Sequence, residues 1–93
     1  MTDMVARAYE PSDVEYAEVL FAMPLQESDN PGSTQVRAAV LRCIAGHGGD
    51  LGWFAERLAQ EAGDHPAEAA CRMRWALATV RGAFPESTLA LAG

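Results

Sequence analysis

The stretch PAEAACRMRWALATVRGAF, residues 66–84, decides how this chain is expected to fold. Its apolar residues recur at helical spacing, and they predict a core stripe of Ala69, Ala70, Met73, Ala76, Leu77, Val80 and Phe84. A second apolar strip lies on nearly the opposite side of the same helix and holds Cys71, Trp75, Ala78 and Gly82. A helix that is apolar on two faces is either central in its fold or part of an interface. An N-terminal helix of the same chain or a second copy of the protein could equally cover the second strip.

Two further helices are expected in the first half of the chain. Ser12 and Glu15 have the spacing of a capping box and predict a helix over about residues 12–23. Its apolar arc is wider than one packing contact usually needs. After the loop at 24–33, Ser33 or Thr34 is expected to cap a second helix that runs to about residue 45. The core stripe of that helix holds Val36, Ala39, Val40, Cys43 and Ile44.

The joint GHGGDLGWF, residues 46–54, resembles a phosphate-binding loop in its glycines, but its spacing favours a connection between helices. Gly46 is expected to end one helix in a left-handed conformation, and Asp50 to cap the next. That helix is expected to end at Gly63 and to bury a stripe of Leu51, Phe54, Ala55, Leu58 and Ala62. Trp53 falls on its polar side.

No segment alternates as a half-buried strand does, so the predicted fold class is all-α, a small four-helix domain. Residues 34–84 are expected to form a three-helix, helix-turn-helix-like core. Residues 1–33 are an acidic N-terminal arm with one helix and a loop, and residues 85–93 are a C-terminal tail.

The charge of the chain is concentrated at its start. The 93 residues have a formal net charge of −6; residues 1–30 hold seven acidic residues and one arginine, whereas the rest of the chain is balanced. This balance argues against generic binding to nucleic acid or an anionic membrane and fits a basic partner. All seven basic residues are arginines, which, with many alanines, indicates a bacterial protein. We expect it in the cytoplasm, because no secretory signal or membrane-spanning run is visible.

The residues that carry chemistry do not form a recognisable catalytic or metal motif. Cys43, Cys71, His47 and His65 are the possible soft ligands, and no second close pair completes a zinc site. Cys71 falls on an apolar strip, where a packed thiol is expected rather than a nucleophile. We therefore predict no enzyme activity, no metal, no cofactor and no small-molecule substrate.

The segment FAERLAQEAGDHPAEAACRMRW, residues 54–75, resembles a helix-turn-helix motif in the spacing of Ala59, Gly63 and Ala69. The positions that would face DNA include His65 and Glu68, and none of them is a residue that commonly reads base edges. The resemblance implies an alternative function, a transcriptional regulator that contacts DNA through Arg37, Arg42, Arg72, Arg74 and Arg81.

The leading hypothesis is a small regulatory or adaptor module that acts by protein–protein contact, with another protein or as a homodimer. Tryptophan and arginine often anchor interfaces, and the first helix offers an acidic face and a broad apolar arc. The candidate contact residues are Trp53, Trp75, Arg74, Arg81, Tyr16, Val19 and Met23.

Overall fold

A computed structural model describes residues 11–85 of the chain, which contain four α-helices and one 3₁₀ turn. The elements are α2 (Asp13–Ala22), η1 (Glu27–Asp29), α3 (Ser33–Gly46), α4 (Leu51–Asp64) and α5 (Pro66–Ala83). Residues 11–85 contain no strand, so the prediction of a small all-α, four-helix domain is confirmed. None of the helices in this range combines the length and the apolar character needed to cross a bilayer.

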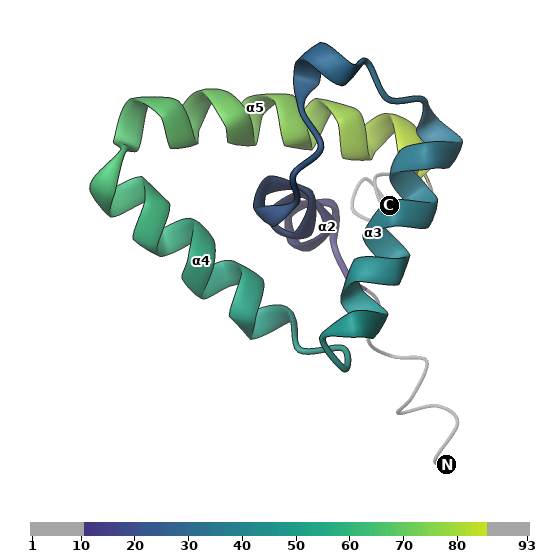
Figure 1. Ribbon diagram of the computed structural model, residues 1–93, viewed down its shortest axis with the longest axis horizontal. Helices are drawn as coiled ribbons and strands as arrows, with labels where there is room; N and C mark the ends of the chain where they lie inside the picture. The colour runs from purple at the N-terminus through teal and green to yellow at the C-terminus, as the bar shows by residue number, and fades with distance from the viewer. Residues whose placement is uncertain (1–10, 86–93) are drawn as a thin grey trace.

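The first of the described helices, α2, lies at the centre of the molecule. Figure 1 shows α2 almost end-on, with α3, α4 and α5 forming three sides of a triangle around it. Four apolar residues that lie close together in the sequence of α2 are buried: Ala17, Val19, Leu20 and Phe21. Residues so close in sequence point in different directions around a helix. The wide apolar arc of α2 is therefore explained by its contacts with three neighbouring helices.

Each outer helix contributes a narrower stripe to the core. Val36 and Val40 come from α3, Phe54 comes from α4, and the buried residues of the last helix and its end are Ala69, Ala76, Val80, Ala83 and Phe84. The predicted stripe of α4 was partly wrong. Ala55 and Ala62 are exposed, whereas Glu61 is half-buried, because the buried line of α4 runs through residues 51, 54, 58 and 61.

Local capping fixes two of the helix starts as predicted. The Ser12 hydroxyl accepts a hydrogen bond from the Glu15 backbone N–H (3.2 Å), and the Glu15 carboxylate accepts one from the Ser12 N–H (2.9 Å). The Asp50 carboxylate accepts from the Gly52 N–H at 3.1 Å. These side chains satisfy donors that have no partner within their helices.

The ends of α3 and α4 differ from the predictions. The N-cap of α3 is Gly32, which has no side chain, so neither Ser33 nor Thr34 caps this helix. Gly46 belongs to α3, and the left-handed residues are Gly48 (φ 65°) and Gly49 (φ 81°). The sharp turn after α3 therefore begins two residues later than predicted.

The connection between α4 and α5 is one residue long. Gly63 lies inside α4, His65 alone stands between the two helices, and Pro66 occupies the first position of α5. A helix-turn-helix motif joins its helices by a turn of about three to four residues. The observed connection is shorter than that turn.

The second apolar strip of α5 stays largely open to solvent. Cys71, Ala78 and Gly82 are exposed, and Trp75 is half-buried. The α2 helix therefore does not cover this strip, although it packs against α5. Cys71 is not the packed cysteine that the sequence predicted.

Candidate interaction site

Two arginines of α5 hold the two ends of α2. Arg81 forms an ion pair with Asp13 (Nε–Oδ2 2.9 Å) at the start of α2, and Arg72 bonds the carbonyl groups at its end. The two arginines are nine residues apart, and nine residues of helix span about 13.5 Å. On α2, the contacted residues Asp13 and Phe21 are separated by nearly the same length of helix. Because the later arginine, Arg81, contacts the start of α2 and the earlier one, Arg72, contacts its end, α2 and α5 run antiparallel.

Arg72 is the C-terminal cap of α2, supplied by another helix. Its Nε donates to the Phe21 carbonyl at 2.9 Å, and its Nη2 donates to the carbonyls of Leu20, Met23 and Leu25 at 3.3, 2.6 and 2.8 Å. The last turn of α2 has no basic residue of its own. A guanidinium is favoured there because the C-terminal carbonyls carry partial negative charge. Burial lowers the pKa of Arg72 from its ordinary value, but an arginine stays charged near neutral pH.

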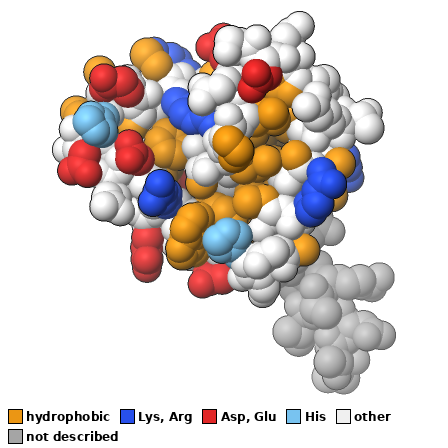
Figure 2. Space-filling model, viewed as in Figure 1, with side chains coloured by type: hydrophobic (Ala, Val, Ile, Leu, Met, Phe, Trp, Pro, Cys, Tyr) orange, Lys and Arg blue, Asp and Glu red, His pale blue; other side chains and the backbone are white. Residues whose placement is uncertain are grey.

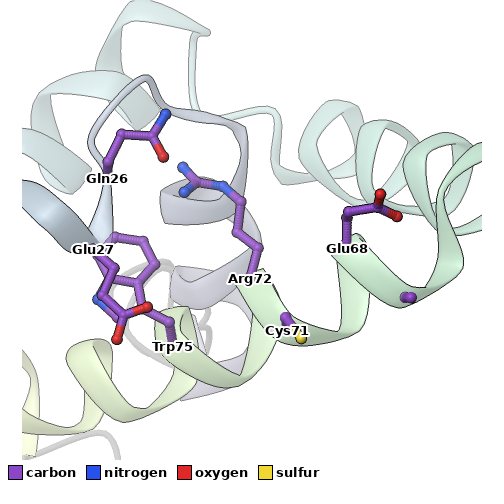
Figure 3. A pocket seen from close by; sticks show the side chains of 7 residues that line it. Gln26, Glu27, Glu68, Cys71, Arg72 and Trp75 are labelled. Carbon is purple, nitrogen blue, oxygen red and sulfur yellow. The ribbon is translucent and has the colours of Figure 1, made fainter.

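The same arginine forms part of a groove at the start of α5. The groove has a volume of about 480 Å³ and is lined by Gln26, Glu27, Ala67, Glu68, Cys71, Arg72 and Trp75. Figure 3 shows Glu27 on the loop side and Glu68 on the α5 side, with Arg72 rising between them toward the end of α2. The Arg72 guanidinium lies 5.2 Å from the centre of the Trp75 ring.

The two carboxylates of the groove have no cationic partner. Among residues 11–85, neither Glu27 nor Glu68 forms an ion pair or a side-chain hydrogen bond. The nearby Arg74 is exposed and donates from Nη2 to the Cys71 sulfur at 3.3 Å. The groove therefore presents two unpaired acids beside an aromatic ring and a thiol.

A separate aromatic cluster lies at the joint between α3 and α4. The His47 ring is 4.4 Å from Trp53 and 4.9 Å from Phe54, and the two rings of α4 are 5.0 Å apart. Phe54 is buried, whereas Trp53 is 40% exposed. A small hollow of about 130 Å³ beside Trp53 is lined also by Glu56, Arg57 and Gln60. Trp53 thus points to the polar side of its helix, as its position in the sequence indicated.

Hydrophobic side chains are also visible on the face that Figure 2 presents. They gather in the middle of this face, over the central helix, and charged side chains surround them. The exposed large apolar residues among those described are Val14, Leu41 and Trp53. The surface therefore offers more than one apolar region. The hollow beside Trp53 holds charges of both signs, Glu56 and Arg57, whereas the groove beside Trp75 holds two acids that have no ion-pair partner among residues 11–85.

The other predicted contact residues lie in different places. Tyr16 stacks on Phe84 with ring centres 4.0 Å apart, and Val19 is fully buried. Met23 is half-buried, and its backbone carbonyl accepts a hydrogen bond from Arg72. The structure therefore brings Met23 near Trp75 through Arg72, and Val19 belongs to the core against which both residues pack, whereas Trp53 lies at the joint between α3 and α4.

The five arginines considered for nucleic-acid binding do not form one free patch. Arg37 donates to the Ala83 carbonyl at 3.1 Å and lies 4.9 Å from the Phe84 ring centre. Arg72 and Arg81 bind the two ends of α2. Arg42 and Arg74 are exposed. Four of the five guanidinium groups therefore make contacts within the chain, since Arg74 donates to the Cys71 sulfur.

The described residues contain no clustered set of metal-binding side chains. No group of three or more His, Cys, Asp or Glu residues within residues 11–85 could hold a metal ion. In the same range, neither histidine hydrogen-bonds a hydroxyl or thiol. Burial raises the pKa of the Cys43 thiol above its ordinary value, which disfavours the thiolate.

Sequence reasoning missed Arg72 as a cap and the acids of the groove. The sequence suggested Arg72 only as a DNA contact, but residue 72 lies three residues after Ala69 and four before Ala76, on the buried line of α5. A second signal was available in the matched intervals from Asp13 to Phe21 and from Arg72 to Arg81. Glu27 and Glu68 gave no such signal, since only the fold brings them together.

Together these features define a small four-helix domain with a central N-terminal helix and an acidic, tryptophan-containing groove. Comparison with models of protein families, with curated proteins and with solved structures finds no significant match to this chain.

Proposed function

We propose that this protein is a small, non-enzymatic regulatory or adaptor module of bacterial origin that acts by protein–protein contact. The observation that carries the proposal is the groove beside Trp75, which lies where the loop after α2 meets the start of α5. A tryptophan that lines a solvent-accessible hollow is a common anchor in protein interfaces. The bacterial origin rests on a composition rich in alanine, with arginine and no lysine.

The openness of the groove favours a protein segment over a small molecule. Its volume of about 480 Å³ is within the range of ligand pockets, which is about 300–1,000 Å³. Five of its seven lining residues, however, are exposed: Gln26, Glu27, Ala67, Glu68 and Cys71. Small-molecule sites usually enclose most of the ligand surface. A chain segment that runs across the surface can use an open groove of this kind.

The same residues speak against DNA as the partner. Phosphate binding depends on free arginine and lysine side chains, and Arg37, Arg72 and Arg81 already bind groups within the domain. The groove itself presents two carboxylates. We therefore do not propose the transcriptional-regulator function, and we expect no shift of a random DNA duplex at micromolar protein and low salt.

Site-specific cross-linking tests the proposed function. A photo-reactive phenylalanine analogue placed at Ala67, in the groove, is expected to capture a defined protein in the native cell. The same analogue at Ala59, an exposed position of α4 that does not line the groove, is the matched control. A product that contains two copies of this chain identifies a homodimer. Equal labelling from both positions contradicts an interaction site at the groove.

A further inference from the structure

We infer that the groove beside Trp75 receives an arginine or lysine side chain from a basic segment of the partner. This inference rests on the proposed function, because it assumes that the groove docks a protein. It adds the chemistry of the docked group, which follows from the charges and the apolar surface that line the groove.

The two acids of the groove are complementary in charge to an incoming cation. Glu27 and Glu68 stand on opposite sides of the groove and have no ion pair within residues 11–85. Exposed carboxylates of one sign attract a cation and raise its rate of encounter. An anionic ligand placed between them would be repelled by both.

Arg72, which also lines the groove, does not neutralise Glu27 and Glu68. Its Nε and Nη2 point to four carbonyl oxygens at the end of α2, which itself carries partial negative charge. The positive charge of Arg72 is therefore already engaged by the helix end. The groove as a whole retains an excess of negative charge, which an incoming cation can balance.

The groove also offers an apolar surface between the acids. Trp75 is half-buried, and Ala67 and Cys71 continue the apolar lining. Arginine and lysine have long aliphatic stems that pack on apolar surface while their charged heads stay beside polar groups. A purely apolar segment would instead remove two carboxylates from water without giving them a partner, which is unfavourable.

A titration followed at the Trp75 indole N–H by NMR tests the inference. The Trp53→Phe variant leaves Trp75 as the single indole of the chain. The probe is the peptide acetyl-Ala-Arg-Ala-Ala-Arg-Ala-amide, and the neutral control is the same peptide with citrulline in place of both arginines. The arginine peptide is expected to shift the indole signal in a saturable, salt-sensitive manner, and the citrulline peptide is expected to leave it in place.

A matched pair of charge variants locates the effect. The double variant Glu27→Gln, Glu68→Gln removes two charges from the groove. The control variant Glu56→Gln, Asp64→Asn removes two exposed charges from α4, outside the groove. The groove variant is expected to weaken peptide binding by about tenfold, and the control variant by less than about twofold. Circular dichroism verifies that both variants keep their helices.

Three outcomes would overturn the inference: equal binding of the two peptides, equal weakening by the two variants, or binding of the arginine peptide that does not move the Trp75 signal. These outcomes are distinct from failure of the proposed function. Suppose that cross-linking at Ala67 captures a protein and that the groove variant leaves this capture unchanged. The proposal of a docking site is then supported, and the inference that a cationic side chain enters the groove is contradicted. If residue 67 captures nothing beyond the control, the docking site itself is wrong. Self-association through the groove would appear as a dimer mass by light scattering and would replace the basic partner by a second copy.

Discussion

At the scale of single residues, Arg72 has the largest structural role of any charged side chain described. It connects the end of the central helix, the following loop and the Trp75 ring. Its planar group with several donors suits this role, because it reaches several carbonyls at once. A lysine at this position has a single ammonium group and cannot reproduce the arrangement.

Replacing Arg72 should therefore destabilise the domain more than replacing any exposed arginine. We expect Arg72→Ala to lower the free energy of unfolding by about 2–4 kcal/mol, since four partly buried carbonyls lose a charged donor. Arg72→Lys should restore less than half of this loss. Chemical denaturation measures both values. Arg42→Ala, at an exposed position of α3, is the control and should change stability by less than about 0.5 kcal/mol.

The ion pair at the other end of α2 is unequal in burial. Asp13 is 2% exposed, its Oδ1 has no hydrogen-bond partner among the described residues, and the Arg81 side chain is 53% exposed. Arg81→Ala leaves a buried carboxylate without its partner and should cost about 1–3 kcal/mol. Adding Asp13→Asn should recover part of this loss, because the remaining group is neutral. A double-mutant cycle by thermal denaturation measures the coupling, and additive effects of the two changes contradict it.

Glu18 gives the stability of the domain a predictable dependence on pH. Burial, and then the neighbouring Glu15 carboxylate, raise the pKa of Glu18 above its ordinary value. The folded state therefore holds this proton more tightly than the unfolded state. The contribution of Glu18 is most favourable below its unfolded-state pKa and decreases as the pH rises through its folded-state pKa.

The Glu18→Gln variant removes this dependence. Relative to the parent protein, it should become progressively more stable as the pH rises from below the ordinary pKa of a glutamate, because the parent loses the contribution of Glu18. Urea denaturation at a series of pH values measures the difference in the free energy of unfolding between the two proteins. Glu56→Gln on the exposed side of α4 serves as the control. A constant difference between Glu18→Gln and the parent over this range would show that Glu18 does not titrate as argued.

At the scale of the elements, the two faces of α2 should respond differently to truncation. Leu20 is fully buried, whereas Val14 on the same helix is 44% exposed. Leu20→Ala should cost about 2–5 kcal/mol, because it leaves a cavity in the core. Val14→Ala should change stability by less than about 0.5 kcal/mol. Comparable losses at both positions would contradict the central placement of α2.

Two glycines in different conformations offer a second comparison between elements. Gly82 lies in α5, and an added Cβ would meet only the Ser33 hydroxyl oxygen at 4.0 Å. Gly82→Ala should therefore stabilise the domain by up to about 1 kcal/mol. Gly49 has a φ of 81° with free space around it, so Gly49→Ala should destabilise by about 1 kcal/mol through backbone strain alone. Thermal denaturation of both variants measures whether each change raises or lowers the stability of the domain.

The sequence predicted those elements whose signals are local. The Ser12–Glu15 box and the Asp50 cap are formed between residues two or three positions apart, so their patterns are visible in the chain itself. The stripe of α5 was readable from its period for the same reason, except at Ala70, which was predicted in the core and is exposed. The end of α2 was not readable, because its cap comes from Arg72, about fifty residues further along the chain.

The candidate site was only partly predictable. Trp75 and the second apolar strip of α5 follow from helical periodicity, but the sequence left open whether the N-terminal helix covers that strip, and the structure leaves most of it exposed. The acids at Glu27 and Glu68 belong to different elements, and only the packing of the loop against α5 makes them neighbours of one groove. Periodicity describes one helix at a time and therefore carries no information on such a pair.

At the scale of the whole molecule, the central helix should be necessary for folding. It supplies Ala17, Val19, Leu20 and Phe21 to a core in which α4 buries only Phe54. A chain that begins at residue 24 should lose cooperative thermal unfolding and most of its helical circular dichroism. Adding a peptide of residues 11–23 in trans should restore both signals. The same peptide with Leu20→Asp is the control and should restore neither.

The position of α2 also determines the order in which the domain can assemble. The partners that hold it are 47 to 52 residues away for Arg72 and 68 residues away for Arg81. Contacts between residues so far apart close large loops, which slows folding relative to helical domains built from local contacts. Among the described helices, α2 is synthesised first and is secured by α5, which is synthesised last. Until α5 is formed, the part of the apolar surface of α2 that packs against α5 remains exposed to the cell, and chaperones or early partners can reach it during that interval.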